Sequence, residues 1–147
     1  MKDLDWSNLS FGYRQTDYNV RCYYRDGKWG EIEVCSDEYL KLHMAATCLH
    51  YGQEAFEGLK AYRCPDGKVR VFRMDENAKR LQSTCRGILM PEVPTEMFEE
   101  MVKKVVRLNQ EWIPTYESGA TLYIRPLLIG TSAQVGVHPA KEYCFLI

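Results

Sequence analysis

Residues 59–73, LKAYRCPDGKVRVFR, decide the fold that the sequence predicts, because they hold two β-prone segments around a tight turn. Leu59 to Arg63 form the outgoing strand, Pro65-Asp66-Gly67 the turn, and Lys68 to Arg73 the returning strand. Successive side chains of a strand point to opposite faces, so Val69, Val71 and Arg73 share one face, and Arg70 and Phe72 share the other. A lone hairpin is marginally stable, so this one predicts further strands or helices that cover it.

A second hairpin is predicted over residues 17–35. Residues 19–24, NVRCYY, are β-prone, and Arg25-Asp26-Gly27-Lys28 supplies an Asp-Gly turn. The chain returns from Trp29 to Val34, where Ile32 and Val34 alternate with two glutamates. Between the hairpins, residues 43–58 are rich in alanine and poor in β-branched residues. They predict a helical or irregular crossing segment that ends at Gly58.

Two helices follow the second hairpin. The first is expected to begin after Asp75, whose carboxylate caps free N–H groups, and its apolar stripe consists of Ala78, Leu81, Cys85, Ile88 and Leu89. Residues 87–94 break it. The second starts after Thr95 and is stopped by Pro114, with a buried face made of Phe98, Met101, Val102, Val105, Leu108 and Trp112.

Continuous apolar runs at 121–129 and 143–147 predict two central strands. Strands and helices do not alternate one for one along the chain, which excludes a doubly wound fold. The sequence therefore predicts an α+β fold: a mainly antiparallel or mixed sheet with helices on one face.

Composition narrows the classes of function. The 147 residues carry 19 Lys and Arg against 20 Asp and Glu, a net charge of -1, which gives no electrostatic case for binding nucleic acid or an anionic membrane. No apolar run is long enough to span a membrane, and the N-terminus has no apolar core of a signal peptide. The six cysteines and three histidines lack metal-ligand spacing. We expect reduced thiols, a cytoplasmic protein and no metal.

Arginines inside apolar stretches suggest a local anion site. Arg125 stands between two apolar runs, and Tyr123 points to the same face, so the two side chains could donate jointly to a carboxylate. Arg80, early in the first helix, could bind a phosphate bidentately. Each arginine also has an alternative without a ligand. Arg125 could reach water from the end of a strand, and Arg80 could be a solvated arginine on the helix surface.

Other residues could serve either the structure or a binding site. Tyr51 and Phe56 are core aromatics or pocket walls, and Gly58 serves a turn or the close approach of a ligand. Val135 and Val137 lie in a predicted loop rich in small residues, which indicates that a partner covers them. No catalytic Ser-His-Asp or Cys-His set, P-loop or dinucleotide fingerprint is present.

Three motifs together resemble one family. They are HYGQEAFEGLKAY at 50–62, VFR at 71–73 followed by Arg80-Leu81, and LYIRPLLIGT at 122–131. The chain resembles, from about Phe11 to Ile147, the N-terminal domain of branched-chain amino acid aminotransferases, which are fold-type IV pyridoxal-phosphate enzymes. The resemblance implies transfer of an amino group between leucine, isoleucine or valine and 2-oxoglutarate, by a cytoplasmic homodimer that binds small molecules.

The resemblance also implies a role for each matching position. Arg80 matches the arginine that holds the phosphate of pyridoxal 5′-phosphate. Substrate-binding positions are matched by Phe11, Tyr51, Phe56, Gly58, Tyr123 and Arg125. Val135 and Val137 match a loop that reaches the site of the neighbouring subunit.

No lysine of this chain matches the family's Schiff-base lysine, which belongs to a second, C-terminal domain beyond Ile147. Residues 1–147 are thus expected to form the small domain only and to be inactive alone. Two alternatives remain. One is another fold-type IV enzyme, a D-amino acid aminotransferase or an aminodeoxychorismate lyase. The other is a non-catalytic binding or dimerisation module, although a chain end inside an apolar strand argues against it.

Overall fold

The computed structural model describes residues 1–147 and confirms the α+β class. Every strand pairing is antiparallel. Three α-helices and two 3-10 turns join the strands. The elements are β1 (Asn19–Arg25), β2 (Lys28–Trp29), β3 (Glu33–Cys35), α1 (Thr47–Tyr51), β4 (Glu54–Phe56), β5 (Leu59–Arg63), β6 (Val69–Val71), α2 (Met74–Gly87), α3 (Thr95–Leu108), η1 (Gln110–Trp112), η2 (Tyr116–Ser118), β7 (Leu122–Ile124), β8 (Leu127–Gly130) and β9 (Tyr143–Leu146).

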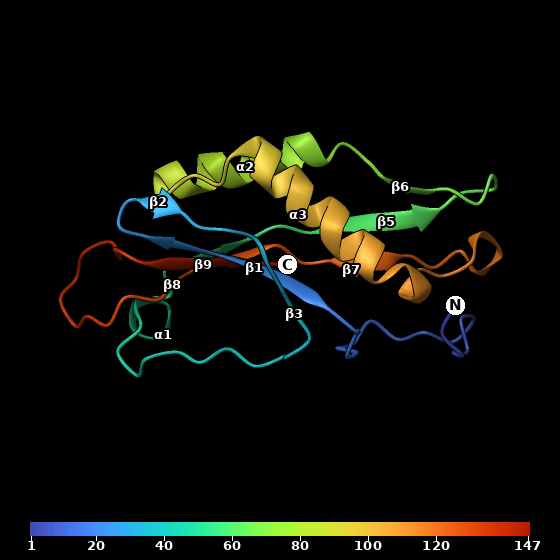
Figure 1. The fold of residues 1–147 in the computed structure, drawn as a ribbon, viewed down its shortest axis with the longest axis horizontal. Helices are drawn as coiled ribbons and strands as arrows, with labels where there is room; N and C mark the ends of the chain where they lie inside the picture. The colour runs from blue at the N-terminus through green and yellow to red at the C-terminus, as the bar shows by residue number, and fades with distance from the viewer.

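The strands form two sheets. The larger has the order β2-β1-β9-β8-β4, with β3 also paired to β1, and the smaller has the order β6-β5-β7. In Figure 1 the smaller sheet lies to the right of the larger one, and the long helices α2 and α3 lie together along one side of the strands. The short helix α1 lies away from them, near β8.

A single two-stranded ribbon joins the two sheets. In the larger sheet β4 pairs with β8 with Phe56 opposite Leu127, and in the smaller sheet β5 pairs with β7 with Leu59 opposite Ile124. These two registers are continuous, so Glu57-Gly58 faces Arg125-Pro126 where the chain passes between sheets. The amide of Glu57 donates to the carbonyl of Pro126 at 2.9 Å. We call residues 54–63 paired with 122–130 the central ribbon.

The core lies between the central ribbon and the helices. Ala78, Leu81 and Cys85 of α2 are buried, as the stripe predicted. The predicted face of α3 is buried at Phe98, Met101, Val102 and Val105, whereas Leu108 and Trp112 are half-buried. Phe98 stacks on Phe145 of β9, with ring centroids 6.0 Å apart. The two helices and β9 thus close over the same apolar layer.

Both hairpins are confirmed, with one irregularity. The return of the first is split into β2 and β3, because three residues, 30–32, lie opposite two residues of β1. This bulge changes the register, and Val34 is exposed rather than inward.

Several local predictions are wrong. Residues 54–56 form a strand within the segment predicted to be helical or irregular. Residues 121–129 form two strands in different sheets, broken at Arg125-Pro126, because proline cannot donate to a ladder.

The helix boundaries also differ. The N-cap of α2 is Arg73 in a left-handed conformation, so Asp75 lies within the first turn and supports the helix dipole instead. Ile88 and Leu89 are exposed because α2 ends at Gly87 and Leu89 adopts a positive φ of 56°. The six cysteines are all unpaired. None of the helices combines the length and the apolar character that a membrane crossing requires.

Candidate functional site

Three side chains form an aromatic and cationic cluster on the central ribbon. The guanidinium carbon of Arg125 lies 4.3 Å from the ring centre of Phe56 and 5.2 Å from that of Tyr123. Arg125 Nε donates to Tyr123 Oη at 2.9 Å. Arg125 forms no salt bridge, so its charge is oriented by aromatic faces and one hydroxyl and remains available to an anion.

Gly58 and Phe11 complete this cluster. Gly58 lies opposite Arg125 in the ribbon, and a Cβ added there would stand 2.7 Å from Tyr123 Oη. Glycine is therefore the residue that leaves room for the tyrosine hydroxyl. The Phe11 ring meets the Tyr123 ring edge-on at 5.2 Å. A cleft of about 710 Å³ beside the cluster is lined by Phe11, Tyr123 and Arg125 among others.

Strand alternation places this cluster. Along the ribbon Ala55, Glu57, Leu59 and Ala61 are buried, whereas Phe56, Gly58, Lys60 and Tyr62 are exposed. On the opposing strand Ile124 and Pro126 are buried, and Arg125 is exposed. We call the side that carries Phe56, Gly58, Tyr123 and Arg125 the outer face, and the side that carries Glu57, Leu59 and Ile124 the inner face. The outer face is directed away from the core.

Arg80 lies at the inner face, bound to Glu57. Its Nε donates to Glu57 Oε1 at 2.8 Å and its Nη2 to Glu57 Oε2 at 2.6 Å, a bidentate pair. Asn77, one helical turn earlier, donates to Glu57 Oε2 at 2.9 Å and to the Gly58 carbonyl at 3.4 Å. The Glu57 side chain is 3% exposed, whereas that of Arg80 is 68% exposed.

The ionisation of this pair follows from its contacts. Burial raises the pKa of the Glu57 carboxyl, but hydrogen bonds from Arg80 and Asn77 outweigh it and hold that pKa below its ordinary value of 4.5. The hydrogen bond to Glu57 in turn raises the pKa of Arg80. Both groups are therefore charged at neutral pH.

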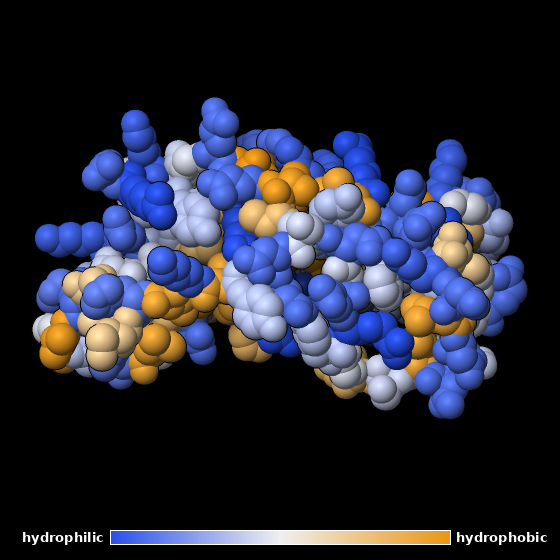
Figure 2. Space-filling view, turned by 60° about the horizontal axis from the view of Figure 1, so that its bottom comes forward, coloured by the Kyte–Doolittle hydropathy of each residue, from blue (hydrophilic) through white to orange (hydrophobic).

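The remaining predicted site residues gather elsewhere. The hydroxyl of Tyr51, at the end of α1, donates to the carbonyl of Val135. The loop after β8 is held beside α1 by the backbone N–H of Gln134, which donates to the Ala45 carbonyl at 3.1 Å. Val135 and Val137 are 74% and 87% exposed. Figure 2 shows apolar residues gathered at the left end of the molecule, where Figure 1 places α1 and this loop.

The structure thus distributes the predicted residues over three places. It brings Phe11, Phe56, Gly58, Tyr123 and Arg125 together, and it brings Tyr51 together with Val135. Arg80 stands on the other face of the ribbon from Arg125, and neither described cleft is lined by both. The structure therefore separates the two arginines that the sequence suggested as parts of a local anion site.

Sequence reasoning missed Glu57 and Asn77. The available signal was the alternation of residues 55–62, in which Glu57 occupies a position that the pattern buries. A buried carboxylate requires a cationic or hydrogen-bonding partner, and residues 77 and 80 occupy one side of the adjoining helix.

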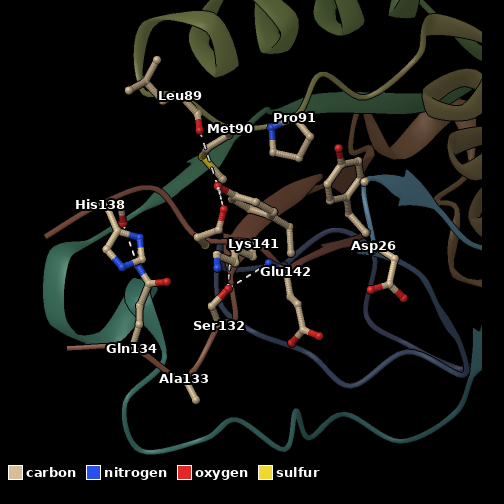
Figure 3. Close-up of a pocket in the computed structure, with 14 residues that line it drawn as sticks. Asp26, Leu89, Met90, Pro91, Ser132, Ala133, Gln134, His138, Lys141 and Glu142 are labelled. Atoms are coloured by element: carbon tan, nitrogen blue, oxygen red, sulfur yellow. Dashed lines mark hydrogen bonds between the residues drawn. The ribbon is translucent and has the colours of Figure 1, made fainter. Parts of the chain in front are cut away.

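A second cleft, of about 950 Å³, is shown in Figure 3. It lies between the β1–β2 turn, residues 89–91 and the loop 132–142, and it contains none of the predicted site residues. Several of its polar groups bind one another. Ser132 Oγ accepts from the amides of Lys141 and Glu142, and Tyr143 Oη donates to the Ala140 carbonyl at 2.9 Å.

This chain is similar to several known aminotransferases. No protein-family model matches it. It is 52% identical over 147 residues to a branched-chain-amino-acid aminotransferase of Haemophilus influenzae, covering all of this chain and 43% of that protein. It is 46% identical to that of Helicobacter pylori, with the same coverage, and 43% identical to a chloroplastic one of Arabidopsis thaliana, of which it covers 35%.

Solved structures agree. A branched-chain amino acid aminotransferase of Escherichia coli matches with a TM-score of 0.68 and 25% identity over 90% of this chain and 40% of that one. A second solved branched-chain amino acid aminotransferase, a complex with pyridoxamine 5′-phosphate, matches with a TM-score of 0.59 and 26% identity, over 85% of this chain and 38% of that one. The chain spans less than half the length of these relatives.

Proposed function

We propose that this chain, a part-length relative of the branched-chain-amino-acid aminotransferases, forms the substrate-binding small domain of such an enzyme. The observation that carries the proposal is the outer-face cluster, in which Arg125 is oriented by Phe56 and Tyr123 but has no anionic partner. The identity of 52% to the Haemophilus influenzae enzyme over the whole chain supports it. The reaction would exchange the amino group of leucine, isoleucine or valine with 2-oxoglutarate.

The outer-face residues suit both kinds of substrate. Arg125 and the Tyr123 hydroxyl can donate to a carboxylate, which favours glutamate or 2-oxoglutarate. The rings of Phe56 and Phe11 supply an apolar wall for a branched side chain. A wall of this kind discriminates by only about 1–3 kcal/mol per methylene, so several branched-chain amino acids would be accepted.

Arg80 would hold the phosphate of pyridoxal 5′-phosphate. Its contacts with Glu57 use one edge of the guanidinium and leave three of its five N–H groups free. That free edge fits a phosphate, and one of the similar solved structures is a complex with pyridoxamine 5′-phosphate. When bound, the cofactor would supply the electron sink that labilises the amino acid at Cα.

The rest of the active site would come from further sequence. We propose that the covalent lysine lies in a C-terminal domain and that residues 1–147 are inactive alone. The exposed Tyr51, Val135 and Val137 would meet a second subunit of a homodimer. The unpaired cysteines support a reducing compartment such as the cytoplasm.

A substrate panel on the full gene product tests the proposal. We expect amino transfer from leucine, isoleucine and valine to 2-oxoglutarate, and Arg125→Gln should lower kcat/KM for 2-oxoglutarate by about 10- to 100-fold, the size of one lost charge-assisted contact. The Lys103→Gln variant, in an exposed ion pair on α3, is the matched control. Preference for D-alanine, or release of pyruvate from aminodeoxychorismate, would instead favour the related fold-type IV enzymes.

The separate inactivity of residues 1–147 is tested by incubating this chain with pyridoxal 5′-phosphate and borohydride. We expect no stoichiometric labelling at any single lysine by peptide mass spectrometry. Stoichiometric labelling at one site, such as Lys60 opposite Tyr123, would contradict this.

A further inference from the structure

A buried carboxylate lies directly behind the exposed arginine at the inner face. Glu57 is nearly inaccessible, yet it engages the Nε–Nη2 edge of Arg80 with both of its oxygens. The pair is therefore oriented in one direction: the anion is inside and the cation reaches outward. A surface ion pair that merely satisfied two long side chains would leave both of them in solvent, as Asp66 and Arg70 do.

Further contacts hold both the carboxylate and the backbone of Glu57. Asn77 donates to Glu57 Oε2, and the Glu57 backbone amide donates to the Pro126 carbonyl across the central ribbon. Since Glu57 lies in the two-residue crossing between β4 and β5, and Asn77 and Arg80 lie on one side of α2, the arrangement depends on helix-to-ribbon packing. It is held by structure on both sides rather than by a flexible loop.

We propose that Glu57, supported by Asn77, is a positioning residue that sets the guanidinium plane of Arg80 and presents its free edge to a phosphate group. The inference rests on the proposed function, in which that phosphate belongs to pyridoxal 5′-phosphate. Two contacts at one edge fix both the position and the rotation of the planar group. The outward edge then offers one N–H from each Nη atom in a parallel fork that matches two phosphate oxygens.

Electrostatics makes an opposite prediction, which gives the test its power. A carboxylate beside Arg80 lowers the local positive potential, so a purely electrostatic neighbour would weaken phosphate binding, and removing its charge would strengthen it. A positioning residue has the reverse effect, because the freed arginine must be ordered at the moment of binding.

The measurement is the ratio of the dissociation constants of pyridoxal and pyridoxal 5′-phosphate, obtained by absorbance titration of the full gene product. This ratio isolates the contribution of the phosphate and does not require activity. We expect Glu57→Gln to lower the ratio about tenfold or more, the size of a lost charged contact. Asp66→Asn, which breaks the exposed bidentate pair with Arg70, should leave it within about twofold.

A double-mutant cycle tests that Glu57 acts through Arg80. Arg80→Lys keeps a cation beside the carboxylate but removes the fork, and it should lower the ratio at least as much as Glu57→Gln. The double variant should lie within about twofold of Arg80→Lys, because the two residues act as one unit. Additive losses, an unchanged ratio in Glu57→Gln, or tighter binding by it would each overturn the proposal.

Two further measurements keep the outcome clear. If thermal melting shows that Glu57→Gln does not fold, Asn77→Ala replaces it, with an expected loss of about threefold in the ratio, and no loss would overturn the proposal. Thermal stabilisation by inorganic phosphate distinguishes failure of the Glu57 proposal from failure of the proposed function. Arg80-dependent stabilisation by phosphate without binding of pyridoxal 5′-phosphate would reject the proposed function alone. The role of Glu57 would then be tested by whether Glu57→Gln weakens stabilisation by phosphate. Binding of neither would reject both.

Discussion

The two arginines beside the two faces of the central ribbon are held in contrasting ways. Arg80 is paired with a buried carboxylate on the inner face, whereas Arg125 leans on the rings of Phe56 and Tyr123 on the outer face and has no anionic partner. A carboxylate fixes the orientation of the guanidinium and neutralises part of its charge, which suits binding of a phosphate that stays in place. Aromatic faces orient a guanidinium while leaving its charge free, which suits a carboxylate that comes and goes.

The largest expected difference between the two is in stability. Arg80→Ala would leave the Glu57 carboxylate buried with Asn77 as its remaining side-chain donor, and it should reduce the free energy of unfolding by about 1–3 kcal/mol. Arg125→Ala leaves no buried charge and should change it by less than about 0.5 kcal/mol. Urea unfolding of both variants measures the difference. Equal effects would show that the carboxylate of Glu57 gains full access to water.

Substitution of Gly58 tests the outer face by function instead of stability. A Cβ at this position would meet Tyr123 Oη at 2.7 Å, and the partly exposed ring can swing outward. Gly58→Ala should therefore fold, but it should lower kcat/KM of the full gene product about 10- to 100-fold by displacing the hydroxyl that orients Arg125. The ratio of the dissociation constants of pyridoxal and pyridoxal 5′-phosphate, which reports on Arg80, should remain unchanged. A decrease in both kcat/KM and this ratio would indicate that the inner and outer faces are not independent.

Acid should weaken the ion pair at the inner face. The folded pKa of Glu57 lies below 4.5, so its ionised form stabilises the fold above that pH, and this contribution is lost as the pH falls through the folded value. The unfolding free energy of wild type, relative to Glu57→Gln, should be constant at neutral pH and should decline below about pH 4.5. Thermal melts at a series of pH values check it. A constant difference down to about pH 3 would show that the carboxyl titrates normally.

The smallest expected effect concerns the aromatic contact. Phe56→Leu keeps an apolar side chain but removes the ring face beneath Arg125, a contact worth about 0.5–1 kcal/mol at an exposed site. KM for 2-oxoglutarate should rise about twofold to fivefold, with kcat changed less. Steady-state kinetics with leucine as the fixed amino donor measures it. Unchanged KM would mean that Tyr123 alone orients the guanidinium.

Local chemistry made much of the fold predictable. The Asp-Gly turns at 26–27 and 66–67 specify hairpins by themselves, and β5 has the predicted limits, Leu59–Arg63. The apolar stripe of α3 identified its buried face, since that pattern depends on residues within a few turns. The ends of elements were less predictable. The positive φ of Leu89 and the left-handed cap at Arg73 are imposed by how the chain must turn, not by the preference of either residue.

Most site residues other than Glu57 and Asn77 were predictable from the sequence, but their grouping in space was not. Motif resemblance singled out Arg80 and Arg125, yet neither motif indicates that a two-residue crossing between sheets separates them. Arg125 and Pro126 interrupt the segment 121–129, but the apolar residues on either side of them do not show which sheet each half will join.

The sequence by itself determined the two hairpins, the two long helices, the local balance of charge and the residues that match aminotransferases, because each of these depends on near neighbours or on residue identity. The tertiary structure alone decided that Glu57 anchors Arg80, that Gly58 makes room for Tyr123, and that Tyr51 joins the loop at Val135. Those contacts join residues 23, 65 and 84 positions apart in the chain. Only packing of the helices and of both sheets against the central ribbon brings such distant side chains within bonding distance.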